Sequence, residues 1–140
     1  WEVPYAPGYI EAVAYIGGKE AARDKRVTAG KPYRLMLELQ NPDVKANGKD
    51  IAIFDCYVVD ENGIEVSDCS AVVDFLAEGA GRVYSTGSDV SDHGSLFSPT
   101  RKMRAGRIGV AVKTGKTSGA LRLIATADGL LPAVYTVEIQ

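Results

Sequence analysis

The sequence has few cysteines and no long apolar run. Two cysteines, Cys56 and Cys69, among 140 residues are too few for a disulfide scaffold or a cysteine-rich zinc site. Apolar stretches stay well short of the roughly 20 residues that a membrane-spanning helix needs. A membrane, a structural metal and a cofactor are therefore not expected.

Excess charge of either sign is also lacking. Lys and Arg together number 16 and Asp and Glu 18, which gives a net charge of −2. Without a positive field, nucleic acid is not an expected partner. Apolar residues make up 46% of the chain, as in a soluble globular domain of ordinary size.

Apolar and polar residues alternate along most of the chain, with the period of a β-strand. Run 51–59 is apolar on both faces except at Asp55, as expected for a central strand. Segment 19–26 has a helix-like composition, although a strand or loop fits it at least as well. Further strands are expected at 11–16, 33–39, 71–77, 108–113, 121–126 and 133–139.

Turn signals separate these runs. Together they predict an all-β fold, an antiparallel β-sandwich of seven to nine strands with no helix longer than two turns. Asn62-Gly63 is a strong two-residue hairpin signal, and that register would place Cys56 opposite Cys69. A three-residue loop with a bulge at Gly63 would shift this register.

The segment 85–107 breaks the pattern, because it is long and rich in Ser, Gly and Asp. Connections of this length are usually functional or form an interface. It predicts a docking surface for a neighbouring domain. The alternative is that the segment folds back over one open end of the sandwich. The docking candidates are Leu96, Phe97, Arg101, Met103, Arg104 and Arg107.

Few residues suggest chemistry. His93 is the only histidine, and its neighbours in one loop rarely reach the geometry of a catalytic triad. Asp89 and Asp92 are candidate ligands of a hard cation, against the simpler interpretation of a hydrogen-bonded loop. Asp55 is either a buried acid or the partner of an arginine. No catalytic carboxylate pair is expected, since most acids lie at turns or on polar strand faces.

Four aromatic residues are candidates for stacking on sugars. They are Trp1, Tyr5, Tyr9 and Tyr84. Residues 1–9 contain two prolines and predict a linker from a preceding domain, with the β-sandwich domain over 10–140. Packing against that domain is the simpler role for Trp1 and Tyr5. The chain starts without Met, so we expect it to be a piece of a longer protein.

The order and spacing of several short motifs resemble one known family. The motifs lie at 3–8, 12–15, 28–32, 35–37, 46–52, 58–63, 73–75 and 125–130. Together they are similar to the C-terminal immunoglobulin-like domain of glycoside hydrolase family 2 enzymes, the β-galactosidase family. The sequence departs from the commonest pattern at 86–93, where many relatives carry an Asn-Gly-Asp turn.

The resemblance implies an immunoglobulin-like sandwich that trails a jelly-roll domain and a central barrel with two catalytic glutamates. Those glutamates have no counterpart here. The implied function is a non-catalytic accessory domain that packs against the rest of a hydrolase of O-glycosyl bonds in carbohydrate metabolism. Its partners would be other domains of the same polypeptide, and a carbohydrate if it binds one. An independent carbohydrate-binding module and an adhesin-like repeat are the alternatives. A bacterial cytoplasmic, periplasmic or secreted location is equally compatible.

Overall fold

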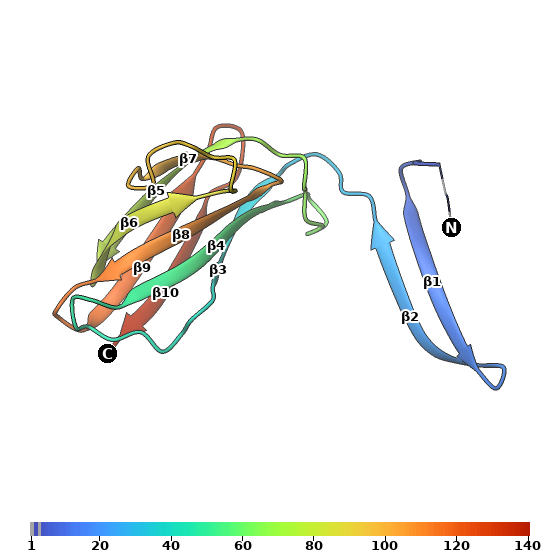
Figure 1. The fold of residues 1–140 in the computed structure, drawn as a ribbon, viewed down its shortest axis with the longest axis horizontal. Helices are drawn as coiled ribbons and strands as arrows, with labels where there is room; N and C mark the ends of the chain where they lie inside the picture. The colour runs from blue at the N-terminus through green and yellow to red at the C-terminus, as the bar shows by residue number, and fades with distance from the viewer. Residues whose placement is uncertain (1, 3) are drawn as a thin grey trace.

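The structure, a computed structural model, describes residue 2 and residues 4–140 (Figure 1). Within these residues it contains ten strands and no helix, so the all-β prediction is confirmed and nothing helical in the described part could span a membrane. The strands are β1 (Tyr9–Ile16), β2 (Lys19–Val27), β3 (Arg34–Leu39), β4 (Ile51–Val59), β5 (Val72–Gly79), β6 (Gly81–Gly87), β7 (Thr100–Lys102), β8 (Arg107–Thr114), β9 (Gly119–Thr126) and β10 (Ala133–Ile139).

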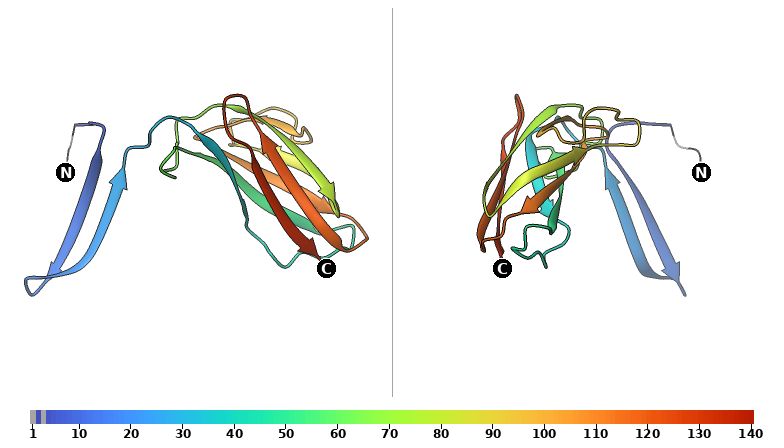
Figure 2. Two further views of the ribbon diagram at one scale, coloured as in Figure 1. Left: turned by 180° about the vertical axis from the view of Figure 1, so that it is seen from behind. Right: turned by 60° about the vertical axis from the view of Figure 1, so that its left-hand side comes forward.

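Eight of these strands form the predicted immunoglobulin-like sandwich. One sheet has the order β10-β9-β5-β7 and the other the order β3-β4-β8-β6. Neighbouring strands within each sheet are antiparallel. Figure 2 shows the two sheets as layers that face each other.

The core lies between the two layers and follows the alternation in the sequence. On β4, Ala52, Phe54, Cys56 and Val58 are fully buried, while the residues between them are more exposed. Burial of one large aliphatic or aromatic side chain stabilises the fold by about 2 kcal/mol. The ring of Phe54 meets that of Tyr135 edge to face at 5.5 Å, across the layers. The predicted central strand over 51–59 is therefore confirmed.

The turn after β4 forms at Asn62 and Gly63, but the predicted hairpin register is wrong. Cys56 lies opposite Leu37 of β3 and Ile108 of β8, so both edges of β4 are already paired. The returning segment forms only the bridge between Val59 and Glu65 before the chain crosses to the other sheet. Cys69 is therefore not the strand partner of Cys56, and both cysteines are buried free thiols.

The two remaining strands, β1 and β2, form an antiparallel ribbon outside the sandwich. A bulge between Ala14 and Tyr15 interrupts their register. The ribbon extends away from the sandwich, and the chain reaches β3 through residues 28–33 (Figures 1 and 2). Segment 19–26 is thus a strand. All residues of the ribbon strands are exposed except Val13, which is half-buried.

Candidate functional site

A loop over residues 88–99 joins β6 to β7, and Arg101 of β7 holds it in place. The Arg101 side chain is only 5% exposed. Its guanidinium donates to the Asp92 carboxylate at 2.9 Å, and to the hydroxyl and carbonyl oxygens of Thr86 at 3.1 and 2.8 Å. A fourth bond reaches the Ser95 carbonyl. The arginine thus ties the loop to strand β6.

The two candidate cation ligands take part in the same loop. The backbone N–H of Gly94 and the hydroxyl of Ser88 lower the pKa of Asp92, with a further contribution from Arg101. The hydroxyl and N–H of Ser91 lower the pKa of Asp89. Within the described part of the chain, no three acidic, histidine or cysteine side chains gather as a metal site would require. These carboxylates stabilise the loop, in agreement with the hydrogen-bonded alternative.

The docking candidates divide into buried and exposed residues. Met103 is fully buried in the core and Arg101 is 6% exposed, so neither can belong to a docking surface. Both point inward because β7 pairs with β5, which places alternate residues on the core side. Leu96 and Phe97 are 56% and 69% exposed. Arg104 is also exposed.

The exposed candidates lie beside one of the aromatic candidates. Phe97 meets the Tyr84 ring edge to face, with centroids 5.5 Å apart. Arg82 and Lys113 place their charges 5.8 and 5.7 Å from the Tyr84 centroid. We call Tyr84, Leu96 and Phe97 the aromatic patch. Two cationic groups and the Phe97 ring already engage the tyrosine ring, which disfavours its use as an open sugar-stacking platform.

Arg107 is engaged within the domain. Its guanidinium binds both oxygens of Glu65, at 2.6 and 2.7 Å, and approaches the Asp55 carboxylate at 3.4 Å. It also lies 5.1 Å from the centroid of the Tyr57 ring. Asp55 is therefore the partner of an arginine and not a buried acid. The arginine lowers the pKa of Glu65 through its hydrogen bonds and charge.

The direction of the carboxyl pKa shifts bears on catalysis. A glycosidase needs a carboxylic acid whose pKa is raised so that it can donate a proton near neutral pH. Among the described residues, six carboxyl groups have a clearly shifted pKa, and the pKa of each is lowered. They are Glu20, Asp50, Asp60, Glu65, Asp89 and Asp92.

Tyr5 and Tyr9 line a hollow of about 660 Å³ between the ribbon and the turn after β4, together with Glu65 and Asp68. The two tyrosines are 83% and 66% exposed. The Lys25 ammonium group lies 4.0 Å from the Tyr9 ring centroid, so that ring is already engaged on one side. Trp1, the remaining aromatic candidate, lies outside the described residues.

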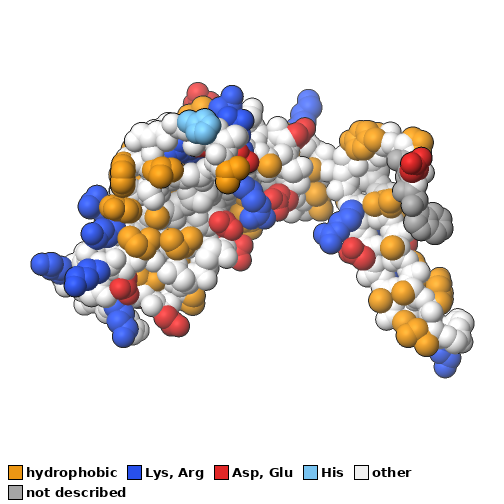
Figure 3. Space-filling model, viewed as in Figure 1, with side chains coloured by type: hydrophobic (Ala, Val, Ile, Leu, Met, Phe, Trp, Pro, Cys, Tyr) orange, Lys and Arg blue, Asp and Glu red, His pale blue; other side chains and the backbone are white. Residues whose placement is uncertain are grey.

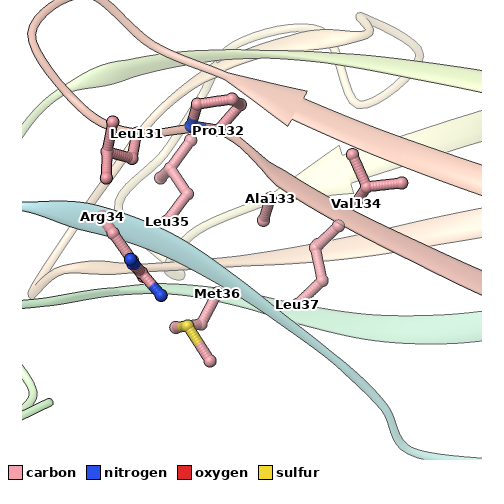
Figure 4. A pocket seen from close by; sticks show the side chains of 8 residues that line it. All are labelled: Arg34, Leu35, Met36, Leu37, Leu131, Pro132, Ala133 and Val134. Carbon is pink, nitrogen blue, oxygen red and sulfur yellow. The ribbon is translucent and has the colours of Figure 1, made fainter.

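A second hollow, of about 460 Å³, lies where edge strands of the two sheets meet (Figure 4). Leu35 and Leu37 point from β3 toward the strand that carries Ala133. The Leu35 N–H donates to the Leu131 carbonyl at 2.9 Å and closes one end. Arg34 is the only charged residue in the lining. The lining of this hollow contains no acidic residue of the kind that hydrolysis requires.

The sequence matches the family described as glycoside hydrolase family 2 C-terminal domain 5 over residues 35–136. It is 30% identical over 142 residues to the beta-galactosidase BoGH2A of Bacteroides ovatus, covering 100% of this chain and 17% of that protein. A beta-galactosidase of Thermoanaerobacter pseudethanolicus is 36% identical over 74 residues, which are 53% of this chain and 10% of that protein.

Solved structures of family 2 glycoside hydrolases also contain a domain that resembles this chain. A family 2 glycosyl hydrolase from Bacteroides cellulosilyticus superposes with a TM-score of 0.93 at 29% identity, covering 100% of this chain and 18% of that chain. This chain therefore spans less than a fifth of the length of these relatives. Because the family match extends over most of its residues, the chain belongs to the family 2 glycoside hydrolases as a C-terminal domain 5.

Proposed function

We propose that the chain is a non-catalytic accessory domain of a larger β-galactosidase-like hydrolase, and that it packs against the rest of that enzyme. The main support is its coverage. It aligns in full with a beta-galactosidase, yet accounts for 17% of that protein, and its family is defined as a C-terminal domain. The lowered pKa values of the six shifted carboxyl groups agree with a role outside catalysis.

A turnover assay tests the proposal. The 140-residue chain and the full-length parent enzyme are each incubated with nitrophenyl β-galactoside. The parent should hydrolyse this substrate, and the isolated chain should release no nitrophenol above the buffer blank. Turnover that copurifies with the isolated chain through successive columns would overturn the non-catalytic role.

Of the docking candidates in the 85–107 segment, Leu96 and Phe97 of the aromatic patch are the exposed apolar ones, and Arg104 is exposed as well. Leu96→Ser and Phe97→Ser in the full-length enzyme should lower its thermal midpoint, because the patch would lose apolar contact with a neighbouring domain. Leu76→Ser is the matched control, since Leu76 is 55% exposed and Leu96 is 56% exposed. If Leu76→Ser and Leu96→Ser lowered the thermal midpoint equally, the patch would have no docking role.

Carbohydrate binding is a second candidate function. It rests on the exposed rings of Tyr5 and Tyr9 and on the charged residues beside them, a combination that sugar sites use. Affinity electrophoresis through gels containing soluble polysaccharides tests it. Retardation that Tyr5→Ala abolishes would support binding, and unchanged mobility in every polysaccharide would exclude it for those sugars.

A further inference from the structure

The β1–β2 ribbon has two different faces. On one face, Arg23 binds Glu11 at 2.6 Å and Glu20 at 2.9 Å. Strand alternation places the aliphatic residues of β1 on the opposite face, where Ala22 lies across from Ala14 and the exposed charged residues of β2 lie across from the others. Those charged residues are Lys19, Asp24 and Arg26, of which the last two form an ion pair at 3.4 Å. We call the apolar part of this face, along β1, the aliphatic face, and its members are Ile10, Ala12, Ala14, Ile16 and Ala22. Ile10 and Ile16 are 59% and 77% exposed, and Figure 3 shows apolar side chains along the ribbon.

The two strands also differ in composition. Six of the nine residues of β2 are charged, whereas Glu11 is the only charged residue among the eight of β1. Charged side chains, lysine above all, are how natural sheets protect an edge strand from further pairing. An interior strand instead carries small and aliphatic residues. Composition thus marks β2 as the edge strand of a sheet and β1 as an interior strand.

In the described part of the chain, however, β1 has only one partner. It pairs with β2, and its other edge pairs with no described strand. A two-stranded ribbon alone is at best marginally stable in water. The outer edge of β1 and the aliphatic face beside it therefore lack a partner among the described residues.

The comparisons indicate where the partner comes from. The family domain begins at residue 35, after the ribbon, and is C-terminal by definition. This chain covers 17–18% of these relatives, so they are about six times as long, and the superposition that covers 100% of this chain includes the ribbon. The missing polypeptide thus lies on the ribbon's side of the domain. A second copy is a poorer fit, because a stable interface needs about 800 Å² from each partner and this face has only two large side chains.

We infer that the ribbon completes a β-sheet of the preceding domain of the parent enzyme. A strand of that domain pairs with the outer edge of β1, and its core covers the aliphatic face. The alanines at 12 and 14 let the facing layer approach closely. The inference rests on the proposed function, since it needs a larger enzyme, and it names the surface through which the accessory domain is attached.

Hydrogen exchange in the full-length enzyme tests the pairing without a mutation. If β1 is an interior strand, all its amides should exchange at least about 100-fold more slowly than those of unstructured peptide. In β2, the edge strand, only alternate amides should be slow, because the others face solvent. The same alternation in β1 as in β2 would overturn the inference. Protection of β1 that disappears when a dimer is diluted to monomer would also overturn it, in favour of a second copy.

Variants in the full-length enzyme test the covered face. Ala14→Asn, across from Ala22, would bury an amide without a partner and should lower the protection of β1 at least about tenfold. Val13→Asn is the control, because Val13 lies opposite Arg23 on the ion-paired face, and it should leave protection within about threefold. Val13 is more buried within this chain than Ala14, so a smaller effect at Val13 would have to come from a cover outside the chain. An equal loss of β1 amide protection in the two variants would overturn the inference that a neighbouring domain covers the aliphatic face. The turnover assay of the 140-residue chain reports on the proposed function alone, so the two failures can be told apart.

Discussion

The Asp60 carboxylate joins two backbone segments near the start of the sandwich. Asp60 is 4% exposed, and its oxygens accept hydrogen bonds from the N–H groups of Gly30 at 2.7 Å and of Asn62 and Ile64 at 2.9 Å. These donors lower its pKa, with Gly30 making the largest contribution. One side chain therefore fixes both the connection from the ribbon and the turn after β4.

The first prediction follows from the direction of this shift. A carboxyl group whose pKa is lower in the folded state contributes stability above its unfolded pKa of about 3.9, and that stability is lost as the pH falls through the folded value. Urea midpoints should therefore drop as the pH decreases below about 4. Asp60→Asn should lower the midpoint at neutral pH and flatten the acid limb. Asp43→Asn, in an exposed loop, is the control. An acid limb as steep in Asp60→Asn as in the native chain would contradict the assignment.

The second prediction concerns Cys56. Burial raises the pKa of this thiol to about 12, and the neighbouring Asp55 carboxylate adds to the effect. Since the thiolate is the reactive form, Cys56 should not react with a disulfide reagent at about pH 8 while the domain is folded. Ellman's reagent on a Cys69→Ser variant measures Cys56 alone, and concentrated guanidinium should release full reactivity. Rapid reaction of the folded variant would show that the core opens readily around β4.

Among the elements, β7 is only three residues long and depends on Arg101 for its contact with the loop. Our third prediction is that Arg101→Met destabilises the sandwich by about 2–3 kcal/mol, because it removes the charged donor to the Asp92 carboxylate and to the carbonyls of Thr86 and Ser95. Amide exchange over residues 88–99 should rise in parallel. Arg104→Met is the control, and as an exposed change it should stay within about 0.5 kcal/mol. Unchanged exchange in the loop would show that other bonds hold it.

The turns supply the fourth prediction. Gly106 has φ 70°, and a Cβ there would lie 2.0 Å from the Val66 carbonyl oxygen. Gly63 has a similar φ of 81°, yet a Cβ there would meet nothing within 4 Å. Gly63→Ala should therefore cost about 1 kcal/mol in conformation alone. Gly106→Ala adds a backbone clash and should cost at least about 3 kcal/mol. Thermal unfolding of both variants measures the difference, and equal losses would mean that the Val66 segment gives way.

Alternation predicted six of the eight strands of the sandwich, because a strand with one buried face must alternate, but it did not predict β6 or β7. The sequence predicted strand partners less well than strand positions, because the same alternation fits more than one partner. Cys56 and Cys69 fit a hairpin register, but β4 pairs with β3 on one edge and with β8 on the other. No local sequence signal reveals these distant strand partners. Within 85–107, Arg101 and Met103 have the spacing of inward-facing residues. Strand β7 has only three residues within this polar segment, which is too few to show the two-residue alternation of a β-strand.

For the whole molecule, the sequence could not separate the ribbon from the sandwich. Apolar and polar residues alternate with period two in both parts. The sandwich strands pair and pack with one another within the described chain, whereas the outer edge of β1 pairs with no described strand. The candidate site shows the same limit. Exposed rings such as Tyr5 and Phe97 could be named from the sequence, but their neighbours Lys25 and Tyr84 come from pairing and packing.

The last prediction concerns the independence of the two parts. Every residue of the core cluster, including those packed at its margin, lies at Ala29 or later in the chain. The link between Gly30 and Asp60 also survives removal of the ribbon. A chain that starts at residue 28 should therefore keep its thermal midpoint within about 2 °C of the 140-residue chain, followed by circular dichroism. A fall of more than about 5 °C would show that the ribbon stabilises the sandwich directly. An unchanged midpoint would mean that the apolar residues of β1 serve a surface outside this domain.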